Sequence, residues 1–122
     1  MARILITDDE EPIRAALTAV LEAGGHAVVQ ASSAREALRL HQEEPADLVI
    51  TDLVMREMDG TELLRRLRAS DPGLPFIGMS GNKHGTMYLN MAKMIGADCV
   101  LEKPIAPGRL LEAVQTALGG RL

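Results

Sequence analysis

The chain has 122 residues, 47% of them hydrophobic, which is enough for the core of one domain but not of two. Its formal net charge of −4 argues against a surface that neutralises nucleic-acid phosphates, so we expect no direct nucleic-acid binding. The N-terminal sequence turns acidic at Asp8, before it reaches the apolar length of a signal peptide, and no stretch approaches a membrane span. We therefore expect a cytoplasmic protein without membrane contact, with one domain over residues 1–122.

The chain begins with a pattern typical of a strand, a helix and a second strand. Residues 3–7 form a short apolar run that stops at an acidic cluster, as buried strands of parallel sheets do. Pro12 suits a first helical turn, and apolar residues then recur at helical spacing until Gly24 and Gly25 end the helix. Residues 26–31 predict the second strand.

The next segment repeats this alternation. Ser33, followed three residues later by Glu36, predicts a capping box at the start of the second helix. A third strand is predicted over residues 47–52. Asp59 and Glu62 have the same spacing and predict a cap for the third helix, which ends at an Asp-Pro-Gly turn.

The last part of the chain predicts two more strands and two more helices. Residues 76–80 form the fourth strand, and a glycine-containing loop leads to a helix over 87–95 with methionines along one face, interpreted as a core stripe. Residues 99–101 form the fifth strand, in which Cys99 is expected to be small and buried. Pro107 begins the final helix.

Five strands that alternate with five helices predict an α/β fold with a parallel, doubly wound sheet, because each short connection forces a right-handed crossover. Helices then cover both faces of the sheet. In such folds, ligands bind beyond the carboxyl ends of the strands, where the strand order reverses. The candidate functional residues should therefore stand at the strand ends.

Polar side chains do stand at these ends: Asp8 and Asp9 after the first strand, Asp52 at the third, Ser80 at the fourth and Lys103 after the fifth. Three carboxylates brought together repel one another, so a cation is expected among them. Oxygen ligands favour magnesium over zinc. Zinc would also need histidine or cysteine pairs with ligand spacing, and we interpret the histidines as surface or loop residues, namely His26, His41 and His84.

An acceptor carboxylate, a metal, an ammonium and a hydroxyl form a site suited to receiving a phosphoryl group, whose oxygens need positive partners during transfer. Asp52 would be the nucleophile, with Lys103 and Ser80 as partners of the phosphoryl oxygens. Each acid alone could instead be a helix cap or part of an acid-rich helix start. Caps do not explain the Lys103-Pro104 step, nor why residues 53–59 exceed the usual connection of roughly 2–6 residues.

These residues resemble the receiver family of two-component response regulators over essentially the whole chain. The resemblance rests on the following motifs: Asp8-Asp9, the run 47–52, Met58-Asp59-Gly60, Ser80-Gly81, Gly96-Ala97-Asp98 and Lys103-Pro104. It implies a flavodoxin-like strand order of 2-1-3-4-5. It also implies a signalling domain that catalyses only its own phosphorylation and slow dephosphorylation.

By the same resemblance, Asp52 would take its phosphoryl group from a sensor histidine kinase or a histidine phosphotransfer protein, and hydrolysis would reset the switch. Asp9, Asp52 and the carbonyl of Val54 would hold Mg²⁺, with Asp8 assisting beside them. Lys103-Pro104 would be a cis peptide. The output domain or partner protein that reads the switch stays open.

The sequence departs from the family at three positions. Arg56, Ile105 and Val100 stand where the family usually carries proline, phenylalanine or tyrosine. An aromatic ring at the position of Val100 moves inward in relatives when the hydroxyl residue shifts. Its absence predicts weaker reorganisation of the fourth helix, or a readout through Tyr88 or the methionine face.

Three other functions fit parts of the pattern. A small-molecule phosphatase that forms an aspartyl phosphate would share the aspartate, serine, lysine and magnesium, but it would require a second acid where Val54 stands. A flavodoxin-type cofactor binder needs a glycine- and hydroxyl-rich phosphate loop where residues 8–11 are acidic. A purely structural interaction module would leave the complete set of polar side chains unexplained.

Overall fold

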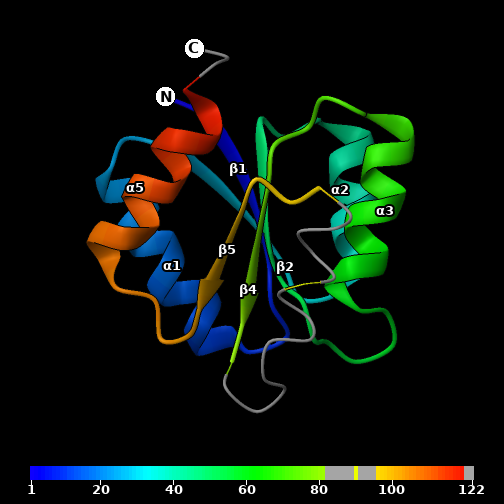
Figure 1. Ribbon diagram of the computed structural model, residues 1–122, viewed down its shortest axis with the longest axis horizontal. Helices are drawn as coiled ribbons and strands as arrows, with labels where there is room; N and C mark the ends of the chain where they lie inside the picture. Colours follow the sequence, from blue (N-terminus) through cyan, green and yellow to red (C-terminus); the bar gives the residue numbers. More distant parts are fainter. Residues whose placement is uncertain (82–89, 91–95, 120–122) are drawn as a thin grey trace.

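The computed structural model describes residues 1–81, 90 and 96–119, which build a five-stranded sheet between two layers of helices (Figure 1). All pairings are parallel, and the strand order β2-β1-β3-β4-β5 confirms the prediction. The strands are β1 (Arg3–Thr7), β2 (Ala27–Ala31), β3 (Leu48–Asp52), β4 (Phe76–Ser80) and β5 (Cys99–Glu102).

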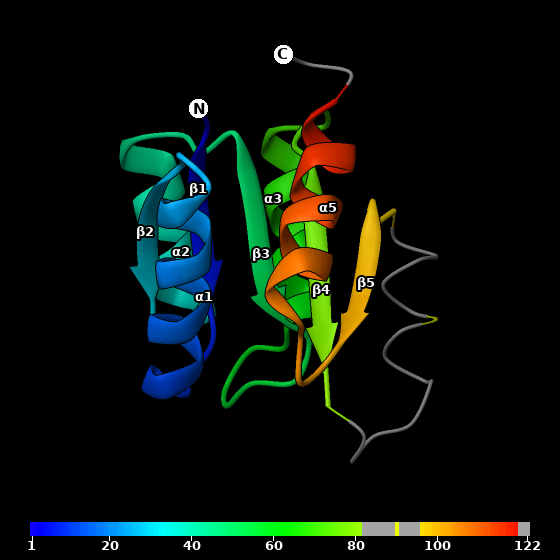
Figure 2. The ribbon, with the colours of Figure 1, turned by 90° about the vertical axis from the view of Figure 1, so that its left-hand side faces the viewer.

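Helices α1 (Glu11–Ala23) and α5 (Pro107–Leu118) cover one face of the sheet, and α2 (Ala34–Glu43) and α3 (Gly60–Ser70) cover the other. Figure 2 shows α1 and α5 in front of the strands, whose arrowheads all point to the same edge. These four helices confirm four of the five predicted. The predicted fourth helix, with its methionine face and Tyr88, lies outside the described residues.

Each face of the sheet has its own hydrophobic core. On the α1 and α5 side, Ile4, Ile6 and Ile50 pack against helix residues such as Leu21 and Leu110. The other core gathers different residues: Leu5, Val49, Leu63, Leu67 and Phe76 among others. Every residue of β3 and β4 is buried, as expected of central strands covered on both faces.

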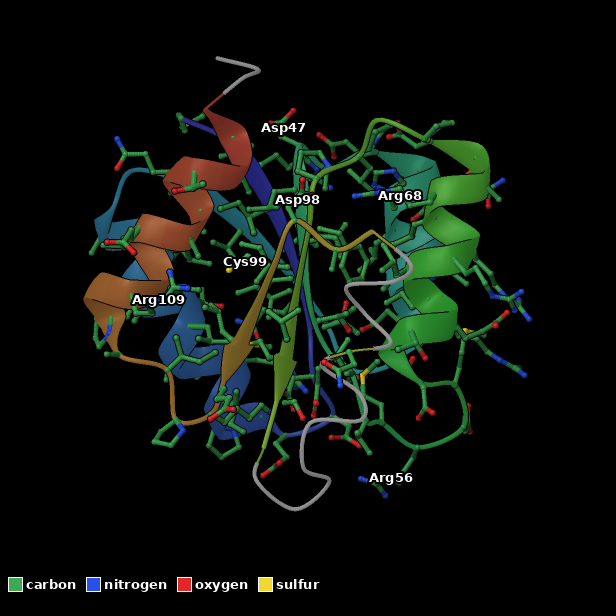
Figure 3. All side chains as sticks on the ribbon, in the orientation of Figure 1. Asp47, Arg56, Arg68, Asp98, Cys99 and Arg109 are labelled. Carbon is green, nitrogen blue, oxygen red and sulfur yellow. The ribbon has the colours of Figure 1, made fainter. Side chains whose placement is uncertain are left out.

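Cys99 is only partly buried, contrary to the expectation of a buried thiol. It lies on the edge strand β5, where one side of the strand has no described strand partner. Its Sγ accepts a hydrogen bond from an Arg109 side-chain nitrogen 3.6 Å away, and Figure 3 shows both residues on the α5 side. The edge position explains why a residue in an apolar run stays accessible.

The two predicted helix caps have different outcomes. Ser33 caps α2 through its hydroxyl, which accepts the Glu36 N–H at 3.1 Å, while the Glu36 carboxylate accepts the N–H of Ser32. Asp59 occupies the N-cap of α3 but makes no side-chain cap bond. Glu62 instead pairs with two arginines further along its own helix, Arg65 and Arg66. The predicted N-cap position is therefore confirmed, but the side-chain cap is absent, and ion pairs one turn along hold the glutamate.

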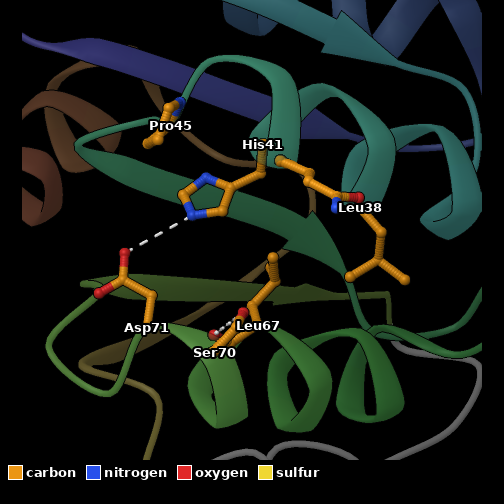
Figure 4. A pocket seen from close by; sticks show the side chains of 7 residues that line it. Leu38, His41, Pro45, Leu67, Ser70 and Asp71 are labelled. Carbon is orange, nitrogen blue, oxygen red and sulfur yellow. Dashed lines mark hydrogen bonds and ion pairs between the residues drawn. The ribbon is translucent and has the colours of Figure 1, made fainter.

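His41 is a buried residue of α2 on the side that faces α3 (Figure 4), so its interpretation as a surface or loop residue is wrong. Its Nδ1 accepts the N–H of Ala46 at 3.0 Å, and its Nε2 lies 3.5 Å from an Asp71 carboxylate oxygen (Figure 4). Because both ring nitrogens have polar partners, burial leaves neither one unsatisfied. The residue lines a cavity of about 470 Å³ with Leu38, Leu67 and others.

None of the helices within the described ranges is long and apolar enough to cross a bilayer.

Candidate functional site

Asp52 is the last residue of β3 and points into the edge where the parallel strands end. The residue is 6% exposed. Its Oδ1 accepts the N–H of Val54 at 3.2 Å, and its Oδ2 accepts a hydrogen bond from Lys103 Nζ at 3.0 Å. A buried carboxylate with one donor on each oxygen is held in a fixed orientation.

Lys103 joins two strands of the sheet through its ammonium group. Besides Asp52, its Nζ contacts Asp8 Oδ2 at 2.8 Å, and Asp8 is completely buried at the end of β1. The backbone of Lys103 is itself anchored, since its N–H donates to the Ser80 carbonyl at 2.8 Å. The Lys103-Pro104 peptide is cis, as predicted. One ammonium thus serves two buried carboxylates from different strands.

The pKa values of Asp52 and Lys103 are both raised, for different reasons. Burial raises the pKa of Asp52 above its ordinary value, and the Lys103 hydrogen bond and the Val54 N–H offset this only in part. Burial alone would lower the pKa of Lys103, but its hydrogen bonds to Asp8 and Asp52 outweigh that effect and raise it. The hydrogen-bond donors of Asp52 therefore offset the burial of its carboxylate only in part.

A metal-free titration should reveal this imbalance. We expect the Asp52 carboxyl to titrate at a higher pH than in an unfolded peptide, because the folded state holds its proton more tightly. The contribution of Asp52 to folding stability should then fall as the pH rises from the ordinary carboxyl pKa through the raised one. Carboxyl carbon NMR without divalent ions, paired with urea unfolding across the same pH series, measures both effects. A titration midpoint below that of the peptide would contradict the burial argument.

Asp9 lies beside these residues and pairs with Arg56 instead of Lys103. Its Oδ2 accepts the backbone N–H of Arg56 at 3.4 Å and lies 3.7 Å from Arg56 Nε. Carboxylate oxygens of Asp8, Asp9 and Glu10 all lie within 4.8 Å of one another. Glu10 is an addition to the acids that the sequence singled out, and its exposed side chain simply follows the acidic pair.

The donor set fits a hard divalent cation. The ligand atoms near one another are all carboxylate oxygens, which Mg²⁺ prefers. Asp8, Asp9 and Asp52 carry three negative charges, and the partly buried ammonium of Lys103 offsets one of them when the exposed Arg56 guanidinium is not counted. One divalent cation would balance the remaining two charges.

Ser80 and Val54 lie at the same edge but have local partners. The Ser80 hydroxyl is buried and donates to the Gly81 carbonyl at 3.2 Å. Across the described ranges it makes no hydrogen bond to Asp52 or Lys103. Val54 contributes its N–H to Asp52, as described above. The structure thus brings Asp8, Asp52 and Lys103 into direct contact, with Asp9, Ser80 and Val54 around them.

Two residues that the sequence did not mark as functional support Asp52 and Asp8. A Cβ on Gly60 would lie 2.8 Å from Leu53 Cα and closer still to the Asp52 carbonyl oxygen, so only glycine lets α3 begin this near to β3. Arg14 on α1 donates from its guanidinium to the Asp8 carbonyl at 2.7 Å. The Met58-Asp59-Gly60 motif could have indicated the role of Gly60, whereas no sequence pattern indicates that of Arg14.

Comparisons with known proteins agree with this architecture. The family model of the response regulator receiver domain matches residues 4–115. The response regulator receiver protein CpdR of Brucella abortus is 41% identical over 97% of this chain and 98% of its own length. The transcriptional regulatory protein GlrR of Escherichia coli is 36% identical over 96% of this chain, which spans only 26% of that relative.

Among solved structures, a response regulator receiver domain protein from Clostridium thermocellum has a TM-score of 0.92 and 33% identity, over 99% of this chain and 97% of that one. The fold, the acidic strand ends and the matched family model agree with one another. The chain therefore belongs to the response regulator receiver domain family of two-component signalling.

Proposed function

We propose that Asp52 is the phosphoacceptor of this receiver domain, with Lys103 and Ser80 as binding partners of the phosphoryl oxygens. The partly buried ammonium of Lys103 carries this proposal, because its Nζ lies 3.0 Å from Asp52 Oδ2 and 2.8 Å from Asp8 Oδ2. It brings a cation and a nucleophilic carboxylate from two strand ends to one point. Residues 1–122 would together form this one domain.

In the proposed reaction, a carboxylate oxygen of Asp52 attacks the phosphorus of a phosphohistidine. The O–P bond forms as the P–N bond breaks, and the leaving imidazole nitrogen takes a proton from solvent. Lys103 already lies beside the attacking group, where its charge can stabilise an oxygen of the phosphoryl group. Ser80 would turn its hydroxyl from the Gly81 carbonyl toward that group.

Asp8, Asp9, Asp52 and the carbonyl of Val54 would hold the Mg²⁺ ion. When bound, the ion supplies positive charge to the phosphoryl oxygens. The chain's own contribution is to hold its carboxylates close despite their repulsion, which the Lys103 bridge and the Arg14 contact to the Asp8 backbone support. A further cation beside Asp52 would offset the burial that raises the pKa of its carboxyl.

The proposed phosphoryl donor is a sensor histidine kinase or a histidine phosphotransfer protein, as two-component signalling requires. We further propose that the domain turns over no substrate except its own aspartyl phosphate. Val54 agrees with this, because it leaves no second acid two residues after Asp52. The partly buried thiol of Cys99, the one cysteine of the chain, fits a reducing, cytoplasmic location.

Incubation with acetyl phosphate, with and without MgCl₂, tests the proposal. We expect a mass increase of one phosphoryl group, lost on mild alkaline treatment, that depends on the metal and maps to the peptide containing Asp52. A phosphatase would instead release phosphate steadily from an ester such as 4-nitrophenyl phosphate. A chain that neither gains the label nor turns over the ester would refute both activities.

A further inference from the structure

We propose that Arg56 is an internal counter-ion of Asp9, which must give way before a divalent cation can bind and which therefore sets the metal affinity of this site. The inference rests on the proposed function, since it takes Asp9 to be a metal ligand. Arg56 lies in the loop between β3 and α3, and Figure 3 shows its side chain at the carboxyl end of the sheet.

The contact joins two atoms of Arg56 to a single oxygen. Asp9 Oδ2 accepts the Arg56 N–H at 3.4 Å, and the Nε of the guanidinium lies 3.7 Å from the same oxygen. The Asp9 side chain is 23% exposed and that of Arg56 is 86% exposed. The arginine thus approaches the acid from the solvent side.

The loop backbone helps to hold Arg56 in place. The Met58 N–H donates to the Arg56 carbonyl at 2.8 Å, and Glu57 between them has a φ of 67°. A three-residue turn with a positive central φ is rare and strained for a residue other than glycine. This tight turn restricts the directions that the backbone at residue 56 can take, so the contact to Asp9 does not depend on the long side chain alone.

The two cations of the site differ in how easily they can be displaced. The Lys103 side chain is 17% exposed and its ammonium binds two carboxylates. Among the residues that the structure describes, the guanidinium of Arg56 binds only Asp9, and its side chain is almost fully exposed to solvent. Exposed ion pairs are weak because water and salt screen them. Arg56 is therefore the cation that a divalent ion can replace, while Lys103 stays.

Formal charges agree with this exchange. Counting only the proposed ligands Asp8, Asp9 and Asp52, the charges of Lys103 and Arg56 leave one negative charge. Release of Arg56 leaves two, which one divalent cation balances. Removing the positive charge of Arg56 should accordingly tighten Mg²⁺ binding. A unit charge about one side-chain length from a divalent ion in high dielectric changes the binding constant by roughly three- to tenfold.

The test is a MgCl₂ titration of the whole chain, followed by backbone amide NMR shifts without any phosphoryl donor. Arg56→Gln should bind Mg²⁺ about fivefold more tightly than wild type at low ionic strength, which follows from the Coulomb estimate. Arg56→Lys, which keeps the charge, should stay within about twofold, a difference set by side-chain geometry. Arg39→Gln is the matched control, because Arg39 is an exposed arginine that pairs with Glu43 on α2.

Salt adds a second readout. The difference in Mg²⁺ affinity between Arg56→Gln and wild type should disappear as the ionic strength approaches about 1 M, because salt screens the charge of Arg56 almost completely there. If wild type binds no Mg²⁺, the proposed metal site itself fails. If wild type binds Mg²⁺ but Arg56→Gln binds no more tightly, or gains no more than Arg39→Gln, the counter-ion role alone is refuted.

Discussion

Asp52→Asn should abolish the metal-dependent label from acetyl phosphate and, at neutral pH, should make the metal-free domain more stable. The amide has no anionic oxygen with which to attack phosphorus, so the loss should be complete. Stability should rise because burial raises the pKa of Asp52, which means that the folded state tolerates the neutral side chain better than the charged one. Lys103 keeps Asp8 as its partner at 2.8 Å, so no buried charge loses its last counter-ion.

We expect a gain of about 1 kcal/mol in the free energy of unfolding, the usual scale for one buried polar substitution. Intact-protein mass spectrometry measures the label, and urea unfolding followed by circular dichroism measures the stability. Asp59→Asn is the control, since it makes the same chemical change at a helix N-cap whose side chain forms no cap bond. Labelling of the Asp52→Asn protein at wild-type level would show that another residue accepts the phosphoryl group.

Gly60→Ala should be the most disruptive single-methyl substitution near the site. The added Cβ would meet backbone atoms of Asp52 and Leu53, with the Leu53 Cα at 2.8 Å and the Asp52 carbonyl carbon at 3.0 Å. Backbone atoms cannot rotate away as a side chain can, so the start of α3 must separate from the end of β3. The Gly60 N–H bond to the Leu53 carbonyl, now 3.0 Å, would weaken with that movement. We expect a loss of about 3 kcal/mol, at the upper end of overpacking costs.

The displacement should also slow phosphorylation, because the methyl group pushes on the backbone of Asp52, the proposed nucleophile. We expect slower labelling by acetyl phosphate at a temperature where the variant is still folded. Gly108→Ala is the matched control, since Gly108 also lies in a first helical turn but has nothing within 4 Å of the position that an added methyl group would take. That variant should gain about 0.5–1 kcal/mol from higher helix propensity. Equal stabilities for the two variants would refute the steric argument.

Much of the fold followed from the sequence because its signals are local or periodic. Short β-branched runs and helical spacing depend on neighbouring residues, and the strand bounds observed for β1 and β4 equal those predicted. The carboxyl ends of parallel strands always meet at one edge, so Asp8, Asp52 and Lys103 could be grouped although 95 residues separate Asp8 from Lys103.

Tertiary structure decided which partner each charged or polar group finds. Glu62 had a capping signal, yet the arginines one turn along compete for it more effectively. We interpreted His41 as a surface or loop residue, but the packing of α2 against α3 buries it. The burial is tolerated because the Ala46 N–H and the Asp71 carboxylate are partners of its two ring nitrogens. Arg56 and Asp9 are 47 residues apart, and only the path of the β3–α3 loop brings them together.

By itself, then, the sequence determined the order of strands and helices and the kinds of chemical group at the strand ends, because periodicity and turn chemistry act over a few residues. The three-dimensional arrangement decided how the charges are shared: one ammonium between Asp8 and Asp52, and an exposed guanidinium on Asp9. Coulomb interactions and burial depend on distances of a few ångströms between remote segments, which no local pattern encodes.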